Sequence, residues 1–149
     1  MIELFSIRLR EVIREDKSGV YGIGAGARVE QYPKPRYVIN IMFGCNPDRV
    51  NELIAGVKSV IEELKNKKTD DSYMTKVKEI QKREFEVNLK ENNFWLNAIY
   101  EFDFNKNDMK KLLSFNDKVD KLTADDIQKA AKKYLTTKNY AEFVLYPEE

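Results

Sequence analysis

Apolar positions in the first third of the chain repeat with the period of a helix and then with that of a strand. Residues 2–14 carry apolar side chains three and four positions apart, which predicts an amphipathic helix. In residues 21–30 apolar side chains alternate with glycine and charged residues, and residues 37–44 alternate again. Because a turn with Pro33 and Pro35 separates these two runs, we expect an antiparallel hairpin.

The remaining pattern is mainly helical. Asn46, Pro47 and Asp48 are typical of a helix start, and an apolar stripe follows them as far as Leu64. Further helices are predicted over residues 72–92 and 108–119, and another after Thr123, which is spaced from Asp126 as in a capping box. Residues 140–146 are predicted to return as a last strand.

Two other features of the pattern predict buried side chains. The aromatic-rich segment 94–104 is interpreted as core, because its rings occur at helical spacing among leucine and isoleucine. Cys45, the single cysteine, has no histidine to act as a base and is interpreted as a small buried residue.

These elements predict an α+β domain with helices layered on a small antiparallel sheet. The length of 149 residues fits a single domain, residues 1–149. Three strands are few for such a chain, so the sheet is either completed by another polypeptide or leaves an exposed edge that self-associates.

Composition excludes several classes of function. Lys and Arg number 26 against 25 Asp and Glu, and basic and acidic residues intermix along the helices, so no nucleic-acid partner is expected. No apolar run reaches the roughly 18 residues of a membrane span, so no membrane partner is expected either. Histidine is absent, which excludes a serine–histidine triad and the usual zinc sites, and no cofactor is expected in this chain.

The glycines at 22, 24 and 26 do not form a dinucleotide-binding loop, since they lie within a strand rather than between a strand and a helix. We interpret them as a flat strand face on which a helix or an extended peptide can lie closely. Arg14 and Tyr21 flank the preceding loop and could present two hydrogen-bond donors to a peptide carbonyl. The alternative is a surface ion pair of Arg14 with a neighbouring carboxylate and a Tyr21 that is only a strand aromatic.

The order of these motifs resembles the C-terminal half of zinc peptidases of the pitrilysin/insulinase type. The resemblance covers residues 5–147. It rests on the Ile-Arg-Glu helix end at 13–15 and the Ser-Gly-Val-Tyr segment at 18–21. It rests further on Asn-Pro-Asp at 46–48, Asn-Asn-Phe-Trp-Leu at 92–96 and Leu-Thr-Ala-Asp-Asp-Ile at 122–127.

The resemblance implies a substrate-binding domain without a metal site in a zinc-dependent metalloendopeptidase. In such two-half enzymes the zinc site, with its H-x-x-E-H motif, belongs to the N-terminal half. Arg14 and Tyr21 match the Arg and Tyr that hold the substrate carbonyl, and the strand at Gly22 and Gly24 would take the peptide in extended form. The partners implied are the N-terminal catalytic domain of the same protein and a peptide substrate, and the location implied is the periplasm or cell envelope.

The resemblance also implies a strand and a helix before residue 2, so a domain truncated at its N-terminus is expected. Two alternatives remain. One is a catalytically inactive scaffold or binding subunit of the same fold, and the other is an interaction domain unrelated to peptidases.

Overall fold

The computed structural model describes residues 1–16 and 20–148, and for Glu15, Asp16 and Tyr21 it describes the backbone alone. The chain divides into two compact units. One comprises Met1–Thr69 with Asp125–Glu149, and the other comprises Asp70–Ala124.

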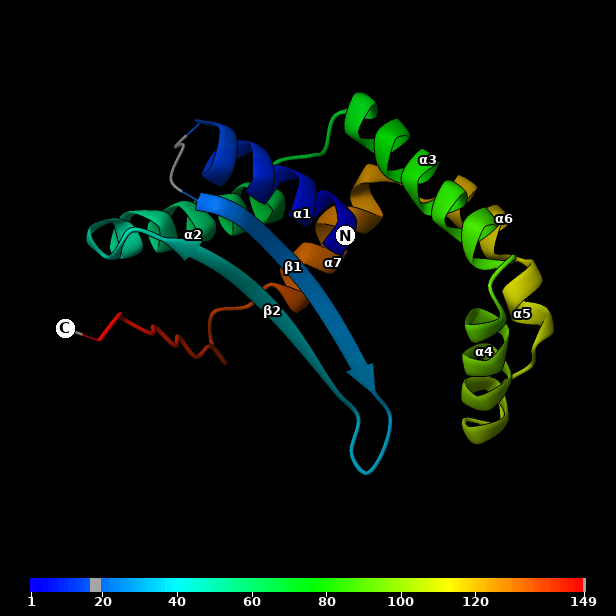
Figure 1. The fold of residues 1–149 in the computed structure, drawn as a ribbon. Coiled ribbons are helices and arrows are strands. Elements are labelled where there is room, and N and C mark those ends of the chain that lie inside the picture. Colours follow the sequence, from blue (N-terminus) through cyan, green and yellow to red (C-terminus); the bar gives the residue numbers. More distant parts are fainter. Residues whose placement is uncertain (17–19, 149) are drawn as a thin grey trace. The chain divides into compact units, whose positions relative to one another are not determined.

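The first unit combines the hairpin with helices α1, α2 and α7 (Figure 1). Its elements in chain order are α1 (Ile2–Leu9), the π-helix η1 (Arg10–Asp16), β1 (Val20–Glu30), β2 (Arg36–Cys45), the 3-10 turn η2 (Pro47–Arg49), α2 (Val50–Asn66) and α7 (Ala124–Tyr134).

The two strands pair antiparallel as predicted, with Ile23 opposite Phe43 and Glu30 opposite Arg36. At the turn end, Arg28 Nε lies 2.8 Å from Glu30 Oε1, and Arg36 also donates to Glu30. The hydrogen bond from Arg36, followed by the charge of Arg28, lowers the pKa of Glu30. Arg28, Glu30 and Arg36 therefore form an ion-pair cluster close to the turn.

The core of the first unit lies between α1, α2 and α7. Phe5, Leu9 and Leu53 are fully buried there, and Ile127 of α7 is 1% exposed. The Asn46 side chain accepts a hydrogen bond from the Asp48 amide at 3.1 Å, as its predicted capping role requires. Ser6 Oγ donates to the Ala25 carbonyl at 3.1 Å and so ties α1 to β1.

In the described chain, the regular elements of the second unit are all helices, joined by short turns. It contains α3 (Asp71–Asn88), α4 (Asn92–Phe104), α5 (Lys110–Leu113) and α6 (Phe115–Lys121). Phe85 stacks on Phe115 at a centroid distance of 4.5 Å and meets Phe94 edge-on at 6.0 Å. Lys78 and Lys82 of α3 both donate to Asp120 of α6, at 2.8 and 2.5 Å, which joins these helices at the surface.

Three predictions are corrected by the structure. Residues 140–146 run without helix or strand structure and do not join the sheet, which has only β1 and β2 within the described chain. Instead of a single helix over 108–119, the chain forms α5 and α6 with a break at Ser114. The aromatic-rich segment is core only in part, since Phe94 and Trp95 are half-buried while Tyr100 is 63% exposed.

Candidate functional site

The predicted donor pair flanks the loop between η1 and β1. Arg14 is exposed and lies in the last turn of η1, which continues α1. The backbone of Tyr21 is in β1, one residue after the strand begins, but its side chain lies outside the described residues. The predicted convergence of the two side chains therefore stays a prediction.

The helix that carries Arg14 is wider than an α-helix. Residues 10–16 form a π-helix, whose backbone bonds join residues five apart rather than four. Such turns are rare and frequently occur at functional sites. The apolar periodicity predicts a helix here but does not distinguish a π-helix from an α-helix, so the sequence did not reveal this feature.

An ion-pair clamp holds the start of this helix in place. Arg8 donates through Nη1 to Glu11 at 2.7 Å and through Nη2 to both carboxylate oxygens of Glu63, at 3.0 and 3.1 Å. Glu63 lies on α2, so the clamp joins two helices. Below it, Leu9 and Ile13 are fully buried, and together these contacts fix the direction in which η1 approaches the loop. The sequence pattern does not predict this contact, because Glu63 and Arg8 are 55 residues apart in the chain.

On the strand side of the loop the β-ladder is irregular. The register between β1 and β2 shifts between Val20 and Ile23, which is where Tyr21 and Gly22 lie. Such irregularities often lie beside active sites, where they redirect a side chain.

The glycines of β1 form a bare strand face. A Cβ atom added at Gly22, Gly24 or Gly26 would meet no heavy atom within 4 Å. Opposite Gly24, the side chain of Met42 is 78% exposed. This agrees with the predicted flat face, and no described segment of the chain covers it.

The described residues do not contain a metal site. Among them, no group of three or more histidine, cysteine, aspartate or glutamate side chains is placed to hold an ion. Cys45 is half-buried and has a free thiol, so it is less enclosed than predicted. In the part of the chain that is described, none of the helices has the length and hydropathy needed to cross a bilayer.

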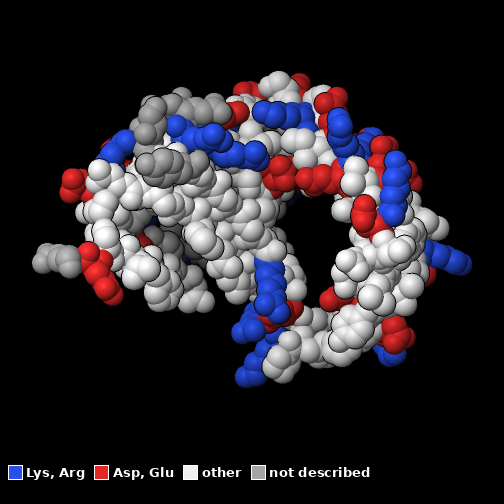
Figure 2. All heavy atoms as spheres, viewed as in Figure 1, with Lys and Arg blue, Asp and Glu red and all other residues white. Residues whose placement is uncertain are grey.

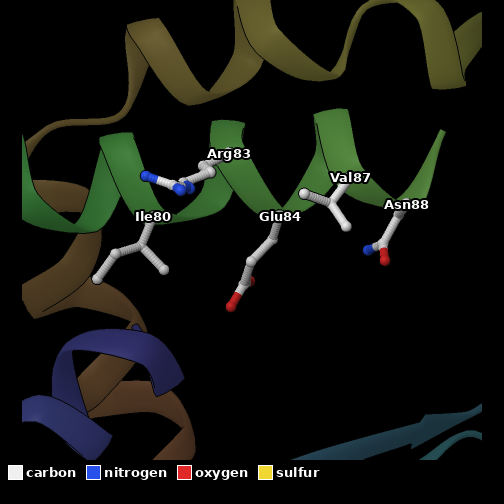
Figure 3. A pocket seen from close by; sticks show the side chains of 5 residues that line it. All are labelled: Ile80, Arg83, Glu84, Val87 and Asn88. Atoms are coloured by element: carbon white, nitrogen blue, oxygen red, sulfur yellow. The ribbon is translucent and has the colours of Figure 1, made fainter. Parts of the chain in front are cut away.

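An open depression of about 560 Å³ lies in the second unit, along α3. All five residues that line it belong to this helix, and Figure 3 shows their side chains projecting from it (Ile80, Arg83, Glu84, Val87 and Asn88). A ligand site needs enclosing walls from several elements, so this depression is a surface feature of one helix.

Comparison with known proteins gives a family match and several fold matches. Residues 1–81, more than half of the chain, match the family model described as the peptidase M16 inactive domain. No curated protein sequence matches the chain.

Three solved structures share the fold at low sequence identity. The periplasmic protease PqqL from Escherichia coli matches with a TM-score of 0.72 and 20% identity, over 90% of this chain and 15% of that one. A protease from Helicobacter pylori matches with a TM-score of 0.71 and 17% identity, over 91% and 34% of the two chains. The ferredoxin protease FusC, solved in complex with Arabidopsis ferredoxin, matches with a TM-score of 0.69 and 17% identity, over 89% and 14%. The chain thus spans about a third or less of the length of each.

Proposed function

The chain belongs to the peptidase M16 family, whose inactive domain it matches, and from this membership we propose that it binds substrate for a zinc-dependent metalloendopeptidase. In this proposal residues 1–149 act as one C-terminal domain, and the N-terminal domain of the parent protein is its partner. A zinc ion bound by that partner would supply Lewis-acid activation of the attacking water. By itself, the 149-residue chain is expected to be inactive.

The observation that carries the proposal is the structure of the chain on either side of residues 17–19. An exposed arginine ends a π-helix on one side, and an irregular strand start with bare glycine backbone lies on the other. Arg14 and Tyr21 are the donors that we assign to the substrate carbonyl. Both side chains carry N–H or O–H groups at neutral pH, and such donors stabilise the negative charge that develops on the carbonyl oxygen during attack.

We assign Gly22 and Gly24 to contacts with the backbone of the substrate. A strand without side chains on one face lets an extended peptide approach the main chain closely. The substrate class is therefore an unfolded or locally extended polypeptide. FusC was solved with a protein partner and PqqL is described as periplasmic, and we propose a protein substrate and a periplasmic or cell-envelope location for the parent here.

The test uses the full-length parent protein. Tyr21→Phe removes one hydroxyl donor and is expected to lower kcat about tenfold or more, with zinc content unchanged. Tyr32→Phe is the matched control, because Tyr32 is 54% exposed in the hairpin turn and is expected to leave kcat unchanged.

Gly24→Ala tests the peptide track separately. Since the added methyl group has open space around it, the domain should fold normally while KM for a peptide rises. A parent protein that binds peptide but does not hydrolyse it, with or without Tyr21, would support the inactive-scaffold alternative instead. Equal kcat for the wild-type protein and Tyr21→Phe would remove Tyr21 from the mechanism.

A further inference from the structure

The guanidinium of Arg8 joins the π-helix η1 to α2. Its Nη1 atom donates to Glu11, in the first turn of η1, at 2.7 Å. Its Nη2 atom donates to both carboxylate oxygens of Glu63, near the end of α2, at 3.0 and 3.1 Å. Arginine carries its donors in a rigid planar fork, which suits it to bind two carboxylates at once. The first turn of η1 is therefore attached to α2 through a single side chain.

A second contact attaches α1 to the strand of the proposed peptide track. Ser6 Oγ donates to the carbonyl of Ala25 at 3.1 Å, and Ala25 follows Gly24, which we assign to the substrate backbone. Ser6 and Arg8 are two residues apart, and the π-helix begins at Arg10, directly after them. The start of η1 is thus fixed relative to both α2 and β1.

The segment between the ion pair and Arg14 is short and closely packed. η1 contacts both α2 and β1, and Ile13, the residue before Arg14, is fully buried. Glu11 and Arg14 are three residues apart and so lie within one turn of the helix. Packed protein interiors transmit a displacement rather than absorb it. A shift of η1 at Glu11 therefore also shifts Arg14.

The arginines of this region differ in what they contact. Figure 2 shows basic side chains over α1 and η1, beside a hairpin surface that is largely uncharged away from its turn. Arg8 donates to the two carboxylates, and Arg10 donates to the Ser6 carbonyl at 3.3 Å. Arg14 is exposed in the last turn of η1, so its direction depends on that of the helix.

We propose that Arg8 and Glu63 are positioning residues for Arg14. Their ion pair sets the direction of η1 and thereby aims the Arg14 guanidinium at the substrate carbonyl. The inference rests on the function proposed above for Arg14 and adds the contact that holds it in place. Because a misplaced donor loses more of its interaction with the transition state than with the bound substrate, breaking the pair should lower kcat and leave KM nearly unchanged.

The first test measures kcat and KM in the full-length parent protein. Glu63→Gln removes the charge at nearly constant shape and should lower kcat about tenfold, with KM unchanged. Arg8→Lys keeps the charge without the fork, so its kcat should also fall. Glu62→Gln is the matched control, since Glu62 is the neighbouring residue of α2 and pairs with Lys65. An unchanged kcat in Glu63→Gln, or an equal loss in Glu62→Gln, overturns the inference.

Arg14→Ala distinguishes positioning from a general structural effect. If Glu63 acts through Arg14, then Glu63→Gln should change kcat less than about twofold once Arg14 is alanine. A full loss in both backgrounds overturns the inference and leaves Arg14 in the proposed function. An unchanged kcat for Arg14→Ala alone removes Arg14 from the proposed function and overturns the inference with it.

A second measurement does not depend on hydrolysis, so it also applies if the parent is the inactive scaffold. In the 149-residue chain, Glu63→Gln should shift the backbone amide NMR signal of Arg14, because the direction of η1 changes. Glu62→Gln should leave that signal in place. An Arg14 signal that does not move in Glu63→Gln overturns the inference.

Discussion

The two units of the chain bury their apolar side chains to different extents. Of the nineteen hydrophobic residues buried in the described chain, fourteen lie in the first unit, and those of α1 and α2 are mostly less than 5% exposed. The second unit buries five, namely Met74, Val77, Phe85, Ala98 and Val119, while Leu96, Tyr100 and Leu113 are more than 60% exposed.

The difference lies in the number of surfaces that each unit can pack together. In the first unit α1 packs against both a sheet and α2, so apolar side chains on opposite faces are covered. In the second unit α3 and α6 cover each other, but α4 offers one apolar face and buries only Ala98. Apolar periodicity therefore predicts that a helix is amphipathic, but burial depends on a second element that covers its apolar face.

Phe5→Ala should give the largest change in the free energy of unfolding. Phe5 is fully buried between the layers of the first unit, and its truncation should lower the free energy of unfolding by about 3–5 kcal/mol. Phe85→Ala is the matched variant in the second unit and should cost less, because Phe85 is 8% exposed and its aromatic neighbours can close the cavity. Urea denaturation measures both losses, and equal losses would contradict the difference between the units.

Glu63→Gln should have an intermediate effect within the first unit. It removes the charge that Arg8 contacts across α1 and α2, and because both side chains are partly exposed the expected loss is about 1 kcal/mol. Hydrogen exchange of η1 should become faster at the same time. Glu62→Gln serves as the control, since Glu62 is exposed and pairs with Lys65 within α2, so its loss should cost clearly less than that of Glu63. Similar effects of the two variants would show that the clamp does not hold η1.

Tyr100→Gln should give the smallest effect. The side chain is exposed on α4, so the free energy of unfolding should change by no more than about 0.5 kcal/mol. Val77→Thr in α3 provides the contrast, because it places a hydroxyl at a fully buried position and should cost about 1–3 kcal/mol. A large loss from Tyr100→Gln would mean that α4 is packed in solution.

Local rules were sufficient to predict much of the fold. The second strand was expected over 37–44 and runs from Arg36 to Cys45, and Asn46 caps the turn that leads into α2. These features depend on neighbouring residues, whose pattern is visible in the sequence. The last strand was wrong because a strand exists only with a partner, and no periodicity within residues 140–146 can reveal whether one is present.

The candidate site also has some features that the sequence predicts and others that it does not. The positions of Arg14 and Tyr21 beside one loop follow from the pattern, and the structure agrees in placing them at the end of η1 and the start of β1. The clamp from Arg8 to Glu63 depends on a contact between residues far apart in the chain, so it could not be predicted. Neither could the π-helix, since its residues are as compatible with an α-helix.

The width of η1 has a consequence for how relatives should be aligned with this chain. A turn closed by bonds between residues five apart contains one more residue than an α-helical turn. A related protein with an ordinary helix here would reach the same loop with a shorter segment. In an alignment, the gap in the related sequence should therefore be placed within residues 10–16 rather than after residue 16. Arg14 should be matched to an arginine of the relative only once that gap is set.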